Sequence, residues 1–334
     1  MNNKSETSEN TEINIYTLET LVKKYLSRDF TPEQSTLMTD VLMFGELSGR
    51  KSHGIGLLTR EDVVWKNRSE REDPETTHTN LISTSIDAKG NPGILVGHLA
   101  MEESIRLGRE NGIGIVTTKG SFSTIGALSY YAEKIGNENL IGIIMSTSRP
   151  VVAPFTSKEP LFGSNPIAIV IPSDLAPVIL DMSTAALSFG TVMEHKVLQK
   201  ELPEGVLIDK HGNPTIDPAH ALEGALLPFG GYKGAGISMM IELLTSTLGG
   251  SSFQGKHAEN GRGNLFITIS PSVVGDIKDL KESAREFIEN LRKIPTSDGK
   301  PMRTPGENTR NIRDMNIKNG TIIVSSSVLK KLSA

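Results

Sequence analysis

The sequence predicts a mixed α and β fold, of the α/β or α+β class, in which a helical module accompanies a strand-rich domain. Apolar residues in the first quarter of the chain recur with helical spacing, whereas short β-branched runs alternate with helical segments farther along. These two patterns divide the chain into a disordered tail at 1–12, a helical module at 13–79 that a C-terminal helix at about 275–334 joins, and a strand-rich domain at 80–274.

The first part of the chain carries helix signals. Thr17 can cap a first helix, whose apolar residues from Leu18 to Leu26 lie three or four positions apart. A second helix begins at the capping box Thr31-Pro32-Glu33-Gln34, which has proline at the first helical position, and ends near Ser48-Gly49. The charged, proline-interrupted segment 66–80 is interpreted as a connection.

Strands and helices alternate in the rest of the chain. The helix predicted at 234–248 is apolar on most faces, so we expect it to be buried. Further helices are predicted at 97–110, 125–134 and 277–291. Strands are predicted at 113–117, 140–145, 167–171, 178–180, 265–269 and 320–325.

Composition excludes several classes of protein. The 334 residues are 37% hydrophobic and 22% charged, as in folded proteins. A net charge of -4 and 5% aromatic content argue against nucleic acid as a partner. The lack of cysteine excludes disulfides and thiolate chemistry. The sequence contains no H-x-x-x-H or H-x-H pair, so a histidine metal site is not predicted. Without a long apolar window or a signal peptide, we expect a cytoplasmic protein with no membrane partner.

The usual nucleotide-binding signatures are also missing. No strand is followed by G-x-G-x-x-G, so an ordinary Rossmann site is not predicted. The run Gly250–Lys256 resembles a phosphate loop, but His257 stands where the magnesium-binding hydroxyl belongs. A surface turn is the better interpretation of this run.

The segment Ser52-His53-Gly54 follows an apolar helix. A histidine beside a hydroxyl can act as a general acid or base near neutral pH, and the glycine lets the backbone approach a ligand closely. From these residues alone, His53 is either a structural histidine or a catalytic one.

Three other segments have two interpretations each. The glycines around Lys233 open an expected helix, and they form either an anion site at its N-terminus or a tight loop. Asp181 follows a buried strand and either orients a ligand or caps Ser183 and Thr184. The run Gly163-Ser164-Asn165-Pro166 is either a turn or a ligand-facing loop.

Six blocks, taken in order, resemble the malate/L-lactate dehydrogenases of the second type. That family also contains ureidoglycolate and L-sulfolactate dehydrogenases, diketogulonate reductase and cyclic ketimine reductases. Each block is weak alone, whereas six in sequence are specific. The blocks are Ser52-His53-Gly54, Val152-Ala153-Pro154, Gly163-Ser164-Asn165-Pro166, Leu180-Asp181-Met182-Ser183-Thr184, Gly224–Gly234 and Pro305-Gly306-Glu307.

The resemblance implies a non-Rossmann NAD(P)-binding fold, with a helical module packed on a largely antiparallel sheet domain. It also implies a homodimer, NAD or NADP as cofactor, and a small molecule as substrate. His53 would donate the proton to the substrate, with Ser52 beside it, and Ser148 would contact substrate or nicotinamide. The cofactor would be held by Asp181, Met182, Ser183, Lys233, Gly234, Gly306 and Glu307.

The chain departs from the family pattern on the substrate side. Thr124 replaces a histidine often assigned acid–base work, and a threonine hydroxyl does not titrate near pH 7. Thr147 replaces an asparagine. Leu57 replaces an arginine that would clamp a substrate carboxylate, and Arg60 and Arg149 are the nearby candidates to compensate. We therefore expect retained cofactor binding with an altered substrate.

The leading hypothesis is an NAD(P)-dependent dehydrogenase or reductase. It would transfer a hydride between nicotinamide and a 2-oxo or 2-hydroxy acid-like substrate. One alternative is an imine or ketimine reductase of the same family, because an imine can already carry its proton. Another is a catalytically degenerate protein that binds cofactor without turnover. Rates on a cyclic imino acid and the matching 2-oxo acid separate the first two hypotheses.

Overall fold

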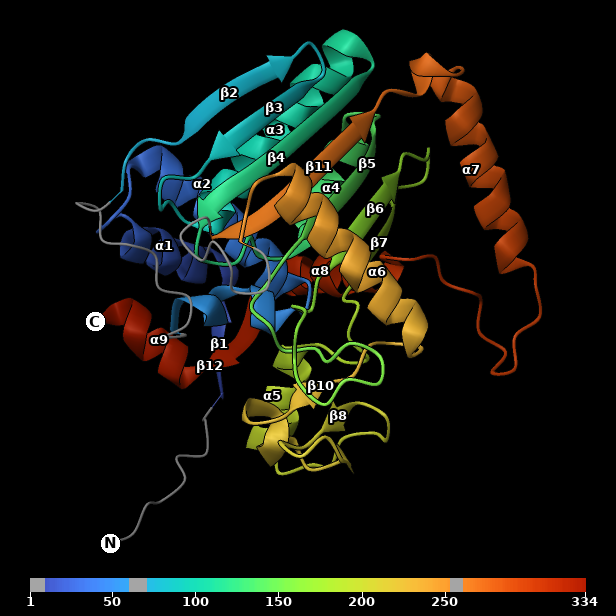
Figure 1. Ribbon diagram of the computed structural model, residues 1–334. Helices are drawn as coiled ribbons and strands as arrows, with labels where there is room; N and C mark the ends of the chain where they lie inside the picture. Colours follow the sequence, from blue (N-terminus) through green and yellow to red (C-terminus); the bar gives the residue numbers. More distant parts are fainter. Residues whose placement is uncertain (1–9, 60–70, 253–260) are drawn as a thin grey trace, which may run out of the picture.

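The structure of the chain, a computed structural model, describes residues 10–59, 71–252 and 261–334 (Figure 1). No helix in these ranges is long and apolar enough to cross a membrane. The strands are β1 (Asn10–Asn14), β2 (Glu75–Asn80), β3 (Ser83–Asp87), β4 (Ile113–Ser121), β5 (Ile141–Ser146), β6 (Ile167–Ile171), β7 (Val178–Met182), β8 (Leu207–Ile208), β9 (Pro214–Thr215), β10 (Ala225–Leu226), β11 (Arg262–Ile269) and β12 (Thr321–Ser325). The α-helices are α1 (Ile15–Leu26), α2 (Pro32–Leu47), α3 (Gly93–Asn111), α4 (Leu128–Asn137), α5 (Phe189–Val197), α6 (Tyr232–Glu242), α7 (Ile277–Arg292), α8 (Glu307–Asn319) and α9 (Ser326–Ser333). Short helices are η1 (Lys51–His53), η2 (Ile55–Thr59), η4 (Pro218–Leu222), η7 (Pro271–Val273) and the π-helix η5 (Leu243–Leu248).

A seven-stranded sheet forms the centre of the molecule, in the order β2-β3-β4-β11-β5-β6-β7. Every neighbouring pair is antiparallel except β3–β4. Helices α3 and α4 pack on one face of the sheet, and α6 crosses the other face (Figure 1). The predicted class, a mixed fold with a largely antiparallel sheet, is confirmed.

The N-terminal helices form as predicted, with one shift. The capping box at Thr31 and Gln34 is present, with both reciprocal bonds. The first helix begins at Ile15, because the Asn14 side chain accepts the N–H of Thr17 at 3.2 Å and so caps the helix. Thr17 therefore lies inside the helix rather than at its cap. Helices α8 and α9 pack against α2 and α1, respectively.

Residues 10–12, assigned to the tail from sequence, form part of β1. This strand pairs antiparallel with β12 at the other end of the chain. Four of its five residues are exposed and polar, so its order comes from backbone pairing that no local pattern reveals. The segment predicted as a connection likewise contains β2, whose six residues are all exposed. An edge strand of this kind has no buried face and therefore no hydrophobic alternation.

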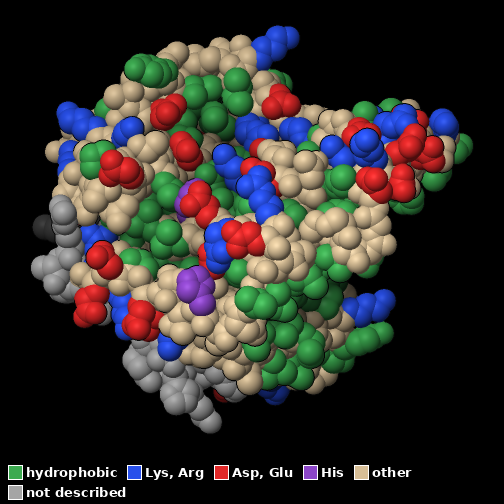
Figure 2. All heavy atoms as spheres, turned by 90° about the horizontal axis from the view of Figure 1, so that it is seen from above, with side chains coloured by type: hydrophobic (Ala, Val, Ile, Leu, Met, Phe, Trp, Pro, Cys, Tyr) green, Lys and Arg blue, Asp and Glu red, His purple; other side chains and the backbone are tan. Residues whose placement is uncertain are grey.

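The C-terminal part of the chain does not join the helical module as one helix. Helix α7 projects from the body, whereas α8, β12 and α9 return to the N-terminal helices (Figure 1). Seen from above, the projecting end carries mixed Lys, Arg, Asp and Glu side chains (Figure 2). Only Ile288 of α7 is fully buried.

Helix α6 is less buried than its apolar sequence predicts. Ile237, Met239 and Met240 are 40%, 48% and 53% exposed, respectively. The helix contacts β5 of the sheet, and its buried residues are Gly234, Ser238, Ile241 and Glu242. The expectation of a fully buried helix is wrong, because one face of α6 points to solvent.

A smaller lobe is built around the three-stranded sheet β10-β8-β9 and helix α5. It has a hydrophobic cluster of its own, separate from the main core, that includes Val152, Phe162, Val192 and Leu207. The lobe lies below the main sheet in Figure 1. The loops that join it to the sheet place polar side chains between the two parts.

Candidate active site

A cleft of about 170 Å³ lies where the lobe meets the main body. Its size suits a small organic molecule. The side chains that line the cleft come from η1 and η2, the loop before α4, the loops next to β5, β6 and β7, the start of α5 and the start of β11. The predicted site residues that line it are Ser52, His53, Thr124, Ser148, Asp181 and Ser183.

His53 stands on the short helix η1, directly after α2. Its Nδ1 atom lies 2.9 Å from the Ser52 hydroxyl, and both side chains are half-buried. The backbone of this turn lies against α2: a Cβ atom at Gly45 would be 2.5 Å from the His53 carbonyl oxygen. The Ser52 contact orients the imidazole ring through its Nδ1 atom.

Three serine hydroxyls join the loops on the opposite wall. Ser148 Oγ accepts the N–H of Ser164 at 2.9 Å and lies 3.2 Å from the Ser164 hydroxyl. Ser183 Oγ donates to the Ser164 carbonyl at 3.0 Å. Gly163 is required here, because a Cβ atom would lie 2.5 Å from both Ser148 O and Oγ. The run from Gly163 to Pro166 is therefore a turn whose Ser164 and Pro166 face the cleft.

Asp181 does not cap Ser183 or Thr184. Its Oδ2 atom accepts the N–H of Ser129 in the first turn of α4 at 3.0 Å. The same oxygen lies 3.8 Å from the Arg50 guanidinium, and the Asp181 side chain is only 9% exposed. Through these two contacts Asp181 joins the end of β7 to the start of α4 and to Arg50, and so fixes this wall of the cleft.

Leu57, at the position of the family's arginine, lines the cleft with only 2% exposure. Three arginines from other parts of the chain line the same cleft: Arg50, Arg149 and Arg262. Arg149 follows β5, and its guanidinium lies 5.2 Å from the Phe189 ring centroid. Arg262 begins β11. The cleft thus keeps cationic side chains although residue 57 is apolar.

Thr124, at the position of the family's second histidine, lines the cleft and is half-buried. Its hydroxyl accepts the N–H of Gly126 at 3.1 Å. The hydroxyl therefore shapes the turn before α4 and still faces the ligand space.

Several predicted cofactor residues lie outside this cleft. Met182 ends β7 opposite Ile167. Lys233 is exposed in the first turn of α6, and its N–H donates to Gly230 O at 3.3 Å. Gly234 is buried, and a Cβ atom there would lie 2.4 Å from Phe229 O. This helix start is a tight loop whose N–H groups at 233 and 234 already have carbonyl partners.

Gly306 lines a second, smaller pocket that shares Arg50 and Asp181 with the cleft. It has φ +81, and a Cβ atom would lie 2.7 Å from Ile179 O. The neighbouring Glu307 accepts the N–H and the hydroxyl of Thr304 and contacts Arg292. The bond from the Thr304 N–H, above all, holds the pKa of Glu307 below its ordinary value. Arg60 lies outside the described residues.

Sequence reasoning missed several cleft residues. Arg50 precedes Ser52-His53-Gly54 by only two positions, and this proximity in sequence is a local signal for its place in the cleft. Ser188 carries a local signal, because its hydroxyl accepts the N–H of Thr191 and caps α5. Arg262 has none, since only the pairing of β11 with β4 and β5 brings it to the cleft.

Comparisons with known proteins agree on one family. The model of the malate/L-lactate dehydrogenase family matches residues 13–333. L-sulfolactate dehydrogenase of Methanocaldococcus jannaschii is 33% identical, over 86% of this chain and 86% of that protein. A Δ1-pyrroline-2-carboxylate/Δ1-piperideine-2-carboxylate reductase of Pseudomonas putida is 32% identical, over 85% of both chains. The solved structure of the M. jannaschii enzyme superposes with a TM-score of 0.85, covering 96% of this chain and 95% of that one at 29% identity.

Proposed function

The chain belongs to the malate/L-lactate dehydrogenase family and is an oxidoreductase, and we propose that it transfers a hydride between a nicotinamide cofactor and a 2-hydroxy or 2-oxo acid. The observation that supports this most is the cleft itself. His53, with Ser52 on its Nδ1 atom, lines the same small space as Arg149 and Arg262. A proton donor and anion-binding side chains in one cleft suit an oxo acid.

The donor set of the cleft fits a nicotinamide. Hydroxyls of Ser148 and Ser183 can bond a carboxamide, and Asp181 with Arg50 forms a fixed polar wall beside them. When bound, the cofactor supplies or accepts the hydride. A dinucleotide is longer than this cleft, so we retain Met182, Lys233, Gly234, Gly306 and Glu307 as proposed contacts beyond it.

The proposed reaction assigns each side chain one task. In the direction of reduction, His53 Nε2 gives a proton to the substrate oxygen, and the Ser52 hydroxyl orients the ring. Thr124 donates a hydrogen bond to the substrate. Arg149 and Arg262 bind the substrate's acid group, since Leu57 cannot. Arg60 stays a predicted contact of the same kind.

An imine or ketimine substrate is the second candidate. The Thr124 hydroxyl does not titrate, and an imine that is already protonated needs one acid group fewer. The name of the Pseudomonas putida relative includes such substrates. With NADH or NADPH as the hydride donor, the ratio of the reduction rates on Δ1-piperideine-2-carboxylate and on a 2-oxo acid such as oxaloacetate or sulfopyruvate decides between the two candidates.

The first experiment is a thermal-shift titration with NADH and NADPH in parallel. A ligand at a hundredfold excess over its Kd should stabilise the protein by about 2.7 kcal/mol. A saturable shift identifies NAD or NADP and leads to the substrate panel. A shift without turnover on any oxo acid or imine would support the catalytically degenerate alternative. No shift with either nucleotide would contradict the proposal.

The exposed face of α6 supports a homodimer. Ile237, Met239 and Met240 are exposed apolar side chains of this helix, and their contact with water is unfavourable. A second copy of the chain would cover it. Light scattering after gel filtration should give twice the 36.1 kDa chain mass, and Met240→Asp should reduce it to one chain. A cytoplasmic location stays a prediction from the sequence.

A further inference from the structure

One buried carboxyl group lies directly under the turn that carries His53. Glu46 is in the last turns of α2 and is only 3% exposed. Its Oε2 atom accepts the backbone N–H of Ile55 at 3.1 Å. Because Ile55 follows His53 by two residues, this bond joins the end of α2 to the far side of the turn.

Two glycines allow this close approach. A Cβ atom at Gly54 would lie 2.4 Å from Glu46 Oε2 and 2.7 Å from the Glu46 backbone nitrogen. The second glycine, Gly45, lies in α2 itself, and a Cβ atom there would lie 2.5 Å from the His53 carbonyl oxygen. The turn therefore rests on α2 through bare backbone, with the Glu46 carboxyl group as its side-chain anchor.

We propose that Glu46 is a positioning residue for His53, which anchors the Ser52-His53-Gly54 turn through the Ile55 N–H. The catalytic meaning of this anchor rests on the function proposed above. Without it, η2 can separate from α2, and the imidazole moves relative to the cleft. The Ser52 contact fixes the ring relative to its own turn, whereas Glu46 fixes the turn relative to the fold.

The anchor depends on an accepting oxygen rather than on a charge. Burial, only partly offset by Lys51 and by the Ile55 N–H, raises the pKa of Glu46 to about 7. The group is therefore partly protonated at neutral pH. Both protonation states keep an oxygen that accepts the Ile55 N–H, and so does the amide of a glutamine.

This distinction separates two variants of the same residue. Glu46→Gln keeps the acceptor, and we expect turnover within a few-fold of wild type. Glu46→Leu removes the acceptor at similar volume, and we expect a roughly 100-fold loss of kcat, the size associated with a displacement of about 1 Å. KM and the NADH or NADPH thermal shift should change little. Glu103→Leu, which removes a carboxylate from the outer side of α3, is the control and should keep wild-type turnover.

Amide hydrogen exchange tests the anchor without any substrate. Peptides that contain Ile55 should exchange faster in Glu46→Leu than in wild type or Glu46→Gln. Wild-type exchange and kcat in Glu46→Leu would overturn the proposal, and so would an equal loss of kcat in both variants. If Glu46→Leu does not fold, Glu46→Asp, whose shorter side chain retracts the acceptor, replaces it with the same expectations. If wild type binds no nicotinamide, the proposed function fails, while the exchange result still decides the anchor.

Discussion

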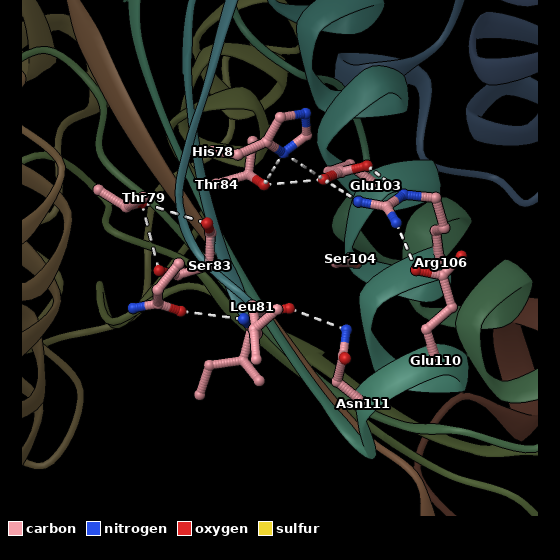
Figure 3. A network of polar contacts seen from close by, with 12 residues as sticks. His78, Thr79, Leu81, Ser83, Thr84, Glu103, Ser104, Arg106, Glu110 and Asn111 are labelled. Carbon is pink, nitrogen blue, oxygen red and sulfur yellow. Dashed lines mark hydrogen bonds and ion pairs between the residues drawn. The ribbon is translucent and has the colours of Figure 1, made fainter.

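Two histidines in the described part of the chain contact a side-chain hydroxyl, and of these two only His53 lines the cleft. His53 Nδ1 lies 2.9 Å from Ser52 Oγ, and His78 Nδ1 lies 3.1 Å from Thr84 Oγ1 (Figure 3). In the second cluster, Thr84 Oγ1 also donates to Glu103 at 2.7 Å, and Arg106 binds the same carboxylate. By side-chain types alone, it is the better catalytic triad.

The surroundings reverse that order. The side chain of His78 is 62% exposed on the edge strand β2, and it does not line the cleft. Ser52 and His53 line the cleft between lobe and sheet, on a turn that rests on α2. A hydroxyl–histidine contact therefore indicates chemistry only where the fold supplies an enclosed space and a fixed backbone. The cluster of His78, Thr84, Glu103 and Arg106, called the outer cluster below, offers matched control variants for the residues tested at the cleft.

The largest expected effect comes from the two histidines themselves. His53→Ala should lower kcat by roughly 10²–10⁴-fold, the usual contribution of general acid–base catalysis, while the NADH or NADPH shift persists. His78→Ala should leave kcat unchanged. Steady-state rates on the best substrate of the panel measure both. Equal rates for the two variants would remove His53 from the reaction.

The two carboxyl groups beneath these histidines should change stability with pH in opposite directions. Burial raises the pKa of Glu46 from 4.5 to about 7, so the folded state holds its proton longer than the unfolded chain does. The contribution of Glu46 to the free energy of unfolding is complete below pH 4.5. As the pH rises from 4.5 to 7, this free energy falls by on the order of 3 kcal/mol. Glu46→Gln should therefore gain stability relative to wild type over this range.

Glu103 provides the opposite sign. Hydrogen bonds from Arg106 lower its pKa, so its contribution is present above the unfolded pKa and is lost as the pH falls through the folded one. Glu103→Gln should lose stability relative to wild type as the pH rises to about 4.5, and the difference should stay nearly constant above that pH. Urea denaturation of the three proteins between about pH 3 and pH 8 measures both slopes, below pH 4.5 for Glu103 and between pH 4.5 and 7 for Glu46. Parallel curves for the two variants would show that burial does not distinguish the two carboxyl groups.

How much of this was predictable depends on the range of each interaction. Thr31 and Gln34 are three residues apart, so the capping box indicated α2 from sequence alone. The position of Asp181 after an apolar run marked it as a candidate site residue. Its role was not predictable, because its partner Ser129 is 52 residues away in the chain. Arg262 reaches the cleft through strand pairing and left no local signal.

The cleft's arginines are expected to have the next largest effect on the reaction. Arg262→Met keeps much of the apolar length but removes the charge, so kcat/KM should fall by roughly 10–100-fold, the contribution of hydrogen bonds to a charged group. Most of the loss should appear in KM, because the acid group is bound equally in substrate and transition state. Arg106→Met, in the outer cluster, should change neither constant. An unchanged KM in Arg262→Met would leave Arg149 as the proposed ligand of the acid group.

The smallest effect should come from the hydroxyl that contacts each histidine. Ser52→Ala removes the partner of His53 Nδ1, so the ring loses one orienting bond while Glu46 still holds its turn. We expect kcat to fall by about tenfold, the contribution of one ordinary hydrogen bond. Thr84→Val removes the matching contact from His78 and should leave kcat unchanged. A loss in Ser52→Ala as large as that in His53→Ala would mean that the serine itself handles the proton, because a purely orienting bond cannot account for the whole contribution of the imidazole.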